Sequence, residues 1–226
     1  MLESLPQVSD RRIAVRITAD ALRHVRAGHP WVFDESVASV NHQGAPGDLA
    51  VIFDNDRRFA AIGLYDPNGP IAIRVLHVGK PTTIDADFWT QAIAAARQIR
   101  QPLVDAESAG HPAFRLINGE NDGLPGFVVD QYDTTLVVKL YSPVWFPHLA
   151  LLTDVLMNTN DATSVVLRLG RNVAAGETYG LDDGDVIAGE IPDGPVLFTE
   201  GGLIFEADVR TGQKTGHFLD QRANRL

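Results

Sequence analysis

Short apolar segments, each bounded by turn-forming residues, dominate the first 80 residues of this 226-residue chain. Four of them are long enough for β-strands: residues 13–17, 49–53, 58–65 and 71–77. Glycine, proline and aspartate separate them, as in Asp66-Pro-Asn-Gly69. Several short strands with one helix predict a small, closed β-barrel.

The helix is expected between Thr18 and Gly28. Thr18 suits the N-cap, Asp20 lies in the first turn, and Gly28 suits the end of the helix. Residues 11–29 are strongly basic, although the formal net charge of the chain is −10. A local basic face can bind RNA on an acidic protein, but the same arginines also fit an ordinary solvated surface.

The following segment predicts a compact α/β unit. Lys80–Thr83 resembles a linker, and Asp85 is a suitable N-cap for a helix that Pro102 is expected to end. An apolar stripe with helical spacing follows that N-cap, made of Phe88, Trp89, Ala92, Ile93, Ala96 and Ile99. Strands are expected at 113–117, 126–130, 136–140 and 164–169, with a helix at 146–157. A hairpin turning at Glu200-Gly-Gly202 is expected last.

Several common functional classes lack their signature residues. The chain has no cysteine, which removes disulfides and thiolate zinc sites. Residues 118–129 begin like a calcium loop, but Val129 stands where the bidentate carboxylate is needed, so no metal site is expected. Thr211-Gly-Gln-Lys-Thr215 lacks the glycine that precedes the lysine of a P-loop, so a nucleoside triphosphatase is not expected. No long apolar run or export signal is present, so no membrane contact and a cytoplasmic location are expected.

The segment Lys214-Thr-Gly-His-Phe-Leu-Asp-Gln-Arg222 resembles the motif that opens the catalytic domain of a methyltransferase family. That family uses S-adenosyl-L-methionine to methylate cytosine C5 in large-subunit ribosomal RNA, and it begins with a PUA domain. Arg26-Ala-Gly-His-Pro-Trp-Val-Phe33 is similar to a PUA segment, and residues 115–130 are similar to the family's central domain. The likeness is good up to residue 140 and weaker afterwards.

The resemblance implies an α+β fold in three parts. Residues 1–80 would form a PUA β-barrel that binds RNA, 81–195 a central α/β domain, and 196–226 a hairpin with the start of a truncated methyltransferase domain. The chain is therefore expected to be an amino-terminal piece without the catalytic Rossmann-like domain. No catalytic residue is expected in it, because a cysteine must attack the pyrimidine and none is present.

Two groups of site residues follow from the resemblance. The expected RNA contacts are Arg16, Arg23, Arg26, His29, Arg57, Arg58 and Arg74. Trp31 and Phe33 are expected in the core, since aromatic residues at a strand start usually pack inward. The expected cofactor-proximal residues are Lys214, Thr215, Phe218, Asp220, Gln221 and Arg222, with Arg225. Phe218 and Leu219 are expected to pack as helix residues, and the charged groups to be solvated or disordered.

Three functions remain open from the sequence. The first is the RNA-binding, substrate-positioning part of an S-adenosyl-L-methionine-dependent ribosomal RNA methyltransferase, inactive by itself and without the cofactor. The second is a freestanding PUA-containing module that binds RNA or the ribosome. The third is a chain whose acidic central surface contacts protein, including a second copy of itself as a homodimer.

Overall fold

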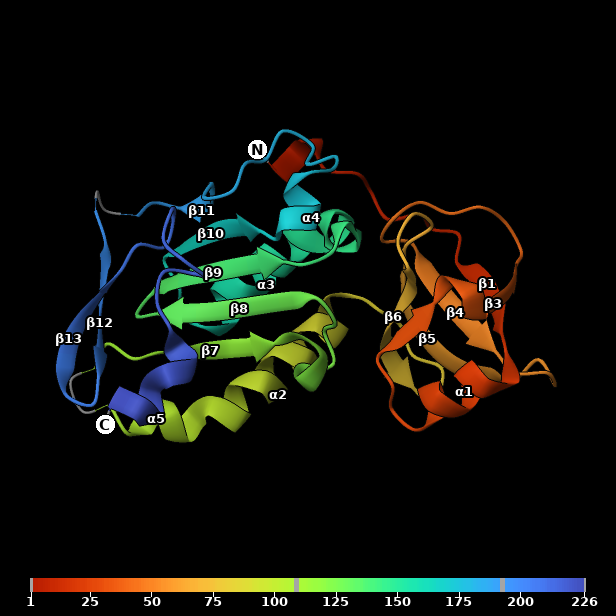
Figure 1. The fold of residues 1–226 in the computed structure, drawn as a ribbon, viewed down its shortest axis with the longest axis horizontal. Helices are drawn as coiled ribbons and strands as arrows, with labels where there is room; N and C mark the ends of the chain where they lie inside the picture. Colours follow the sequence, from red (N-terminus) through yellow and green to blue (C-terminus); the bar gives the residue numbers. More distant parts are fainter. Residues whose placement is uncertain (1, 108–109, 192–193, 226) are drawn as a thin grey trace.

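The computed structural model describes residues 2–107, 110–191 and 194–225. A six-stranded sheet and a five-stranded sheet lie side by side, and a two-stranded hairpin covers the far side of the five-stranded sheet (Figure 1). Short helical elements accompany them, among them η1 (Leu2–Ser4), η3 (Gly119–Asp122) and α4 (Arg171–Ala174). No helix in the described ranges is both long enough and apolar enough to cross a membrane.

The amino-terminal sheet has the order β2-β6-β5-β4-β1-β3. Its strands are β1 (Ile13–Ile17), β2 (Trp31–Phe33), β3 (Val37–Val40), β4 (Leu49–Phe53), β5 (Phe59–Tyr65) and β6 (Ile71–Val78). The prediction of strands was confirmed, but the prediction of a closed barrel was wrong, because β2 and β3 are the two edges of the sheet. The 3-10 turn η2 (Asp34–Ser36) carries the chain directly from one edge to the other, so the covalent chain joins them without strand pairing.

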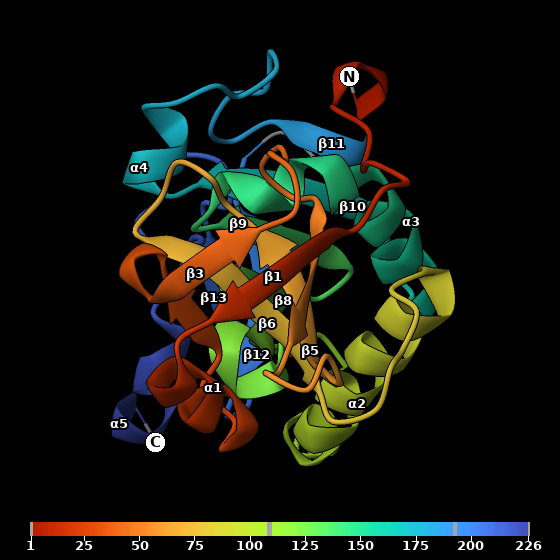
Figure 2. The same ribbon diagram turned by 90° about the vertical axis from the view of Figure 1, so that its right-hand side faces the viewer.

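Helix α1 (Ala19–Arg26) packs against this sheet and is seen below β1 and β3 in Figure 2. The Thr18 side chain accepts a hydrogen bond from Ala21 N at 3.3 Å, which confirms the predicted N-cap. Leu22 and Val25 are buried in a core with Val32 and Ile73. Burying one face of α1 leaves its arginine-bearing face in solvent.

The central sheet has the order β11-β10-β9-β8-β7. Its strands are β7 (Ala113–Asn118), β8 (Phe127–Tyr132), β9 (Thr135–Leu140), β10 (Ser164–Leu169) and β11 (Val186–Gly189). Only the β9–β10 pair is parallel among the pairs that the structure describes in this sheet. Three helical elements pack beside it: α2 (Ala86–Asp105), η4 (Pro143–His148) and α3 (Leu149–Thr159).

Helix α2 departs from its prediction at two residues. Trp89, Ile93 and Ala96 are buried as the apolar stripe predicts, but Ile99 is 68% exposed. Pro102 lies inside the helix, because its carbonyl oxygen still accepts a bond from Ala106 N at 3.2 Å. A proline removes one donor but keeps its acceptor, so the helix continues to Asp105.

The hairpin of β12 (Val196–Glu200) and β13 (Leu203–Ala207) turns at the predicted glycines. Phe198 is buried in a separate core with Tyr132 and Val137 of the central sheet. The chain then passes through η5 (Leu219–Gln221) and α5 (Arg222–Arg225). This core fixes the terminal segment against the sheet.

One continuous core joins the two large sheets. Leu49, Ile62 and Leu64 of the amino-terminal sheet lie in the same buried cluster as Trp89 and Trp145. Polar contacts add to this interface, because His148 Nε2 donates to the Gly47 carbonyl at 2.8 Å. Burial lowers the pKa of His148, which favours the neutral imidazole.

Candidate functional site

The predicted RNA-binding arginines gather mostly around one turn. Arg26 Nη2 on α1 lies 2.8 Å from Asp54 Oδ2, in the turn between β4 and β5. Arg57 and Arg58 belong to the same turn, and Arg16 on β1 donates to Asn55 Oδ1 at 3.1 Å. A hydrogen bond from the backbone N–H of Arg58 lowers the pKa of Asp54. The structure therefore brings Arg16, Arg26, Arg57 and Arg58 together.

Arg74 does not belong to that group. Its side chain is 11% exposed and lies 3.5 Å from Asp66 Oδ2, and Nη1 donates to the Ile71 carbonyl at 3.2 Å. We call the central sheet and the helices beside it the central unit. A Cβ at Gly126 of this unit would meet Arg74 Nε at 3.5 Å, so Arg74 faces the central unit. Desolvation lowers its pKa. Its burial does not support the RNA contact expected for it.

The prediction that Trp31 and Phe33 lie in the core was wrong. Val32, between them on β2, is the residue that is buried, whereas Phe33 is 41% exposed and Trp31 is half-buried. Successive side chains of a strand point to opposite faces, so burying Val32 places both aromatic rings outside. Trp31 Nε1 donates to Glu120 Oε1 of η3 at 3.2 Å, which links this ring to the central unit.

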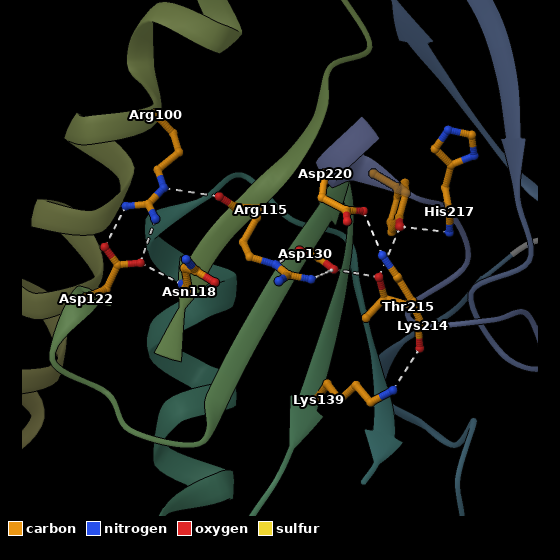
Figure 3. Close-up of polar contacts among 11 residues, drawn as sticks. Arg100, Arg115, Asn118, Asp122, Asp130, Lys139, Lys214, Thr215, His217 and Asp220 are labelled. Atoms are coloured by element: carbon orange, nitrogen blue, oxygen red, sulfur yellow. Dashed lines mark hydrogen bonds and ion pairs between the residues drawn. The ribbon is translucent and has the colours of Figure 1, made fainter. Parts of the chain in front are cut away.

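The terminal motif is held on the central sheet by a chain of hydrogen bonds (Figure 3). His217 N donates to the Tyr132 hydroxyl at 3.1 Å, that hydroxyl lies 3.1 Å from Thr215 Oγ1, and Thr215 Oγ1 donates to Asp130 Oδ2 at 2.5 Å. Asp130 also accepts from Arg115 Nε and Nη2 at 2.8 and 3.0 Å. Burial raises the pKa of Tyr132 to about 12, so it stays a neutral donor.

Arg222 of the motif and Arg225, three residues beyond it, pair with buried acids. Arg222 pairs with Glu107, and Arg225 binds Glu200 through Nε and Nη2 at 2.6 and 2.8 Å. Both carboxylates are almost completely buried. The expectation that the charged groups of this segment would be solvated or disordered was therefore wrong for these two, because the central unit and the hairpin supply buried acids.

The remaining motif residues are more open. Lys214 Nζ lies 2.7 Å from Asp220 Oδ1 and 4.5 Å from the centre of the Phe218 ring. Phe218 is 42% exposed, so the prediction that it packs as a helix residue was wrong. Leu219 does pack partly against the core beneath the hairpin. Gln221 accepts from Asn224 at 2.6 Å within the same segment.

A cavity of about 320 Å³ separates the motif from α2 and β7. Arg100, Arg115, Asp220 and Arg222 are among the residues that line it. Arg222 Nη1 is buried and has no hydrogen-bond partner among the described residues. The wall of this cavity thus carries three arginine side chains together with the carboxylate of Asp220.

Sequence reasoning missed the groups that support this cavity. Arg100 binds Asp122 through both terminal nitrogens, at 2.7 and 2.6 Å (Figure 3). Arg115 and Asp130 are the first and last residues of the segment 115–130, and they lie opposite each other on β7 and β8. A sequence signal existed for this pair: opposite charges at both ends of a hairpin-like segment become neighbours when its strands pair. Nothing comparable in the sequence linked Arg222 to Glu107.

Comparisons with known proteins match the amino-terminal sheet to a domain family and most of the chain to a group of relatives. Residues 15–77 match the family model of a PUA-like domain. The amino-terminal sheet is a PUA-like domain. Over 225 residues the chain is 48% identical to a ribosomal RNA large subunit methyltransferase of Deinococcus radiodurans, covering 98% of this chain and 55% of that protein.

Ribosomal RNA large subunit methyltransferase I of Aeromonas salmonicida is 35% identical over 198 residues, covering 87% of this chain and 49% of that protein. A candidate SAM-dependent methyltransferase from Streptococcus mutans shares the fold with a TM-score of 0.75 at 15% identity, covering 94% of this chain and 52% of that structure. The chain, with its PUA-like domain, thus spans about half the length of the proteins it matches.

Proposed function

We propose that this chain is the RNA-binding and substrate-positioning part of an S-adenosyl-L-methionine-dependent methyltransferase that modifies cytosine C5 in large-subunit ribosomal RNA. The PUA-like domain, within residues 1–80, holds RNA. The central unit, 81–195, sets the distance between that RNA and the methyl donor. Residues 196–226 lead into the donor site. The main support is the basic face of the PUA-like domain, formed by Arg16, Arg23, Arg26, Arg57 and Arg58. The chain's relatives are ribosomal RNA methyltransferases.

The basic face suits RNA in chemistry and in exposure. Arg23 and Arg26 are 73% and 52% exposed; Arg23 pairs with the exposed Asp20, whereas Asp54, the partner of Arg26, is 11% exposed. Exposed ion pairs contribute little stability, so Arg23 can exchange Asp20 for phosphate at small cost. The exposed Arg26 side chain can contact phosphate while it stays paired with Asp54. Phosphate contacts release counterions and make affinity fall steeply with salt.

The terminal motif supplies one wall of the methyl-donor site in this proposal. S-adenosyl-L-methionine carries a carboxylate, and Arg100, Arg115 and Arg222 line a cavity of about 320 Å³. Ligand pockets span about 300–1,000 Å³, so this cavity is at the small end for a nucleoside. The residues here therefore fit the acidic end of the donor, and further sequence supplies the adenosine site and the attacking cysteine.

A titration against large-subunit ribosomal RNA fragments at two salt concentrations tests the proposal. The double variant Arg23→Ala/Arg26→Ala should reduce the slope of log affinity against log salt by about 1.4–1.8, because each phosphate contact contributes roughly 0.7–0.9. A matched control, Lys80→Ala/Arg171→Ala, removes two exposed cations elsewhere and should leave the slope nearly unchanged. Absence of binding at low salt would contradict the proposal.

A further inference from the structure

Four aromatic rings form an exposed cluster on the PUA-like domain. His24 lies 6.2 Å from His29 between ring centres, His29 lies 6.0 Å from Trp31 and 6.4 Å from Phe33, and Trp31 and Phe33 are 6.4 Å apart. We call these four residues the ring cluster. Trp31 and Phe33 both lie outside the core, and Phe33 is 41% exposed. Exposed aromatic side chains grouped in this way are typical of binding surfaces.

The end of α1 builds the first half of the ring cluster. Gly28 N donates to the Val25 carbonyl at 2.9 Å and His29 N donates to the His24 carbonyl at 3.0 Å. This pair of bonds is the Schellman motif, which needs a left-handed residue at its centre and brings the flanking side chains together. Gly28 has a φ of +96° and meets nothing within 4 Å of an added Cβ. The motif thus places the His29 ring beside His24.

Strand β2 builds the second half. His29 Nδ1 lies 3.3 Å from Trp31 N and 3.0 Å from the Trp31 carbonyl, which holds the histidine at the start of the strand. Val32 is buried, so Trp31 and Phe33 share the outer face. The bond from Trp31 Nε1 to Glu120 fixes the indole edge at 3.2 Å. The rings are therefore positioned before any ligand arrives.

Charge is distributed unevenly around the ring cluster. Arg23 and Arg26 lie in the last turn of α1, next to the histidine end. Asp34 and Glu35 directly follow Phe33, at the opposite end of β2. A nucleotide has an aromatic base and a negative phosphate, so its phosphate is attracted to the α1 end while its base lies over the rings.

We propose that the ring cluster binds an unpaired nucleobase of RNA by stacking on Phe33 and Trp31, with the adjoining phosphate held by Arg23 and Arg26. This inference rests on the proposed function and adds the class of substrate: single-stranded nucleotides rather than the body of a duplex. Bases within a duplex are stacked on each other and cannot reach a protein ring, whereas unpaired bases in loops and ends can.

Tryptophan fluorescence provides a direct readout. The chain has three tryptophans, and Trp89 and Trp145 are buried at 1% and 0% exposure. Stacking on Trp31 should quench its emission when short single-stranded polyadenosine RNA is added to the whole chain. A blunt-ended RNA duplex should bind through phosphate contacts without that quenching. Trp31→Phe should abolish the quenching and retain binding of the single strand.

Phe33→Ala tests the contribution of stacking. Its affinity for the single strand should fall roughly 5- to 150-fold, the equivalent of ~1–3 kcal/mol for one stacked base, while its affinity for the duplex stays within about twofold. Phe33→Tyr should restore single-strand binding. Leu151→Ala removes another exposed apolar side chain, on α3, and should change neither affinity. Thermal unfolding should be nearly the same for all three variants.

The outcomes separate this inference from the proposed function. Unchanged single-strand affinity in Phe33→Ala, with a normal loss in the Arg23→Ala/Arg26→Ala variant, overturns stacking and leaves the RNA-binding function in place. Equal quenching by the single strand and the duplex also overturns stacking. No binding of either RNA at low salt overturns both proposals together.

Discussion

Arg23 and Arg26 of the PUA-like domain differ in exposure from Arg100 of the central unit and Arg222 of the terminal segment. Arg23 and Arg26 are largely exposed, and the partner of Arg23, Asp20, is exposed as well. Arg100 and Arg222 are 12% and 18% exposed and pair with acids that are themselves buried. A surface pair can open for a ligand, whereas a buried pair is costly to break. Residue type alone therefore does not indicate the role of an arginine; the exposure of the arginine itself separates the two groups.

The largest effect is expected from a buried acid. Asp130→Ala leaves Arg115 and Thr215 without their shared partner, so the free energy of unfolding should fall by about 3–5 kcal/mol. Urea denaturation measures this change. Asp56→Ala removes an exposed acid that lies 3.6 Å from Arg58 and should alter stability by less than about 1 kcal/mol. Equal losses in both variants would break the comparison.

A smaller loss is expected when the terminal motif is released. Thr215→Val keeps the volume and removes both hydroxyl contacts, which leaves buried partners unsatisfied at a cost of about 1–3 kcal/mol. Amide exchange at His217, whose N–H is bonded to Tyr132, should accelerate. Thr83→Val, at an exposed loop residue, is the control. Unchanged exchange at His217 would show that the motif is held by other contacts.

The turn beneath the ring cluster gives the next effect. Gly28→Ala forces a residue with a Cβ into a φ of +96° and should cost about 1–2 kcal/mol. The same change should weaken quenching of Trp31 by single-stranded RNA, because His29 no longer lies at the start of β2. Gly176→Ala, where the glycine φ is not positive, should be nearly neutral in thermal unfolding.

Acid pH probes the interface between the two large sheets. Burial lowers the pKa of His148 below its ordinary 6.5, so the unfolded chain takes up a proton near pH 6.5 while the folded chain does not. Stability should be complete above that pH and should fall as the pH drops from 6.5 through the folded pKa. His148→Gln should reduce this slope in denaturation at several pH values. A smaller decline should persist, because burial also lowers the pKa of His217.

The smallest change in stability is expected from an exposed arginine of the PUA-like domain. Arg23→Ala alone should change the free energy of unfolding by no more than about 0.5–1 kcal/mol, because its pair with Asp20 is exposed. It should nevertheless lower RNA affinity at low salt. A large loss of stability would mean that this arginine is structural, like those of the central unit.

Sequence patterns predicted the local elements better than the contacts between them. The caps at Thr18 and Asp85 and the turn at Gly201 were evident, because each depends on a few neighbouring residues. The exposure of Trp31 and Phe33 was not, since a shift of one residue in an edge strand exchanges its two faces.

Long-range pairs were the least predictable part of the candidate site. Glu107 and Arg222 are 115 residues apart in sequence, and neither lies in a pattern that names the other. The grouping of Arg16, Arg26, Arg57 and Arg58 near one turn also required the fold, although each was expected as a basic surface residue. The burial of Arg74 depends on the central unit beside it.

The shared core has a consequence for anyone who wishes to use the PUA-like domain as a separate reagent. Leu49, Ile62 and Leu64 are buried in a cluster that includes Trp89 and Trp145 of the central unit. Cutting the chain near residue 80 would expose these leucine and isoleucine side chains at about 1.5–3 kcal/mol each. Gly47 of the PUA-like domain lies very close to the central unit, because a Cβ at this position would meet the Val144 carbonyl at 2.6 Å. A new partner protein would have to fit equally closely against this glycine. Transplantation therefore has to carry both sheets together.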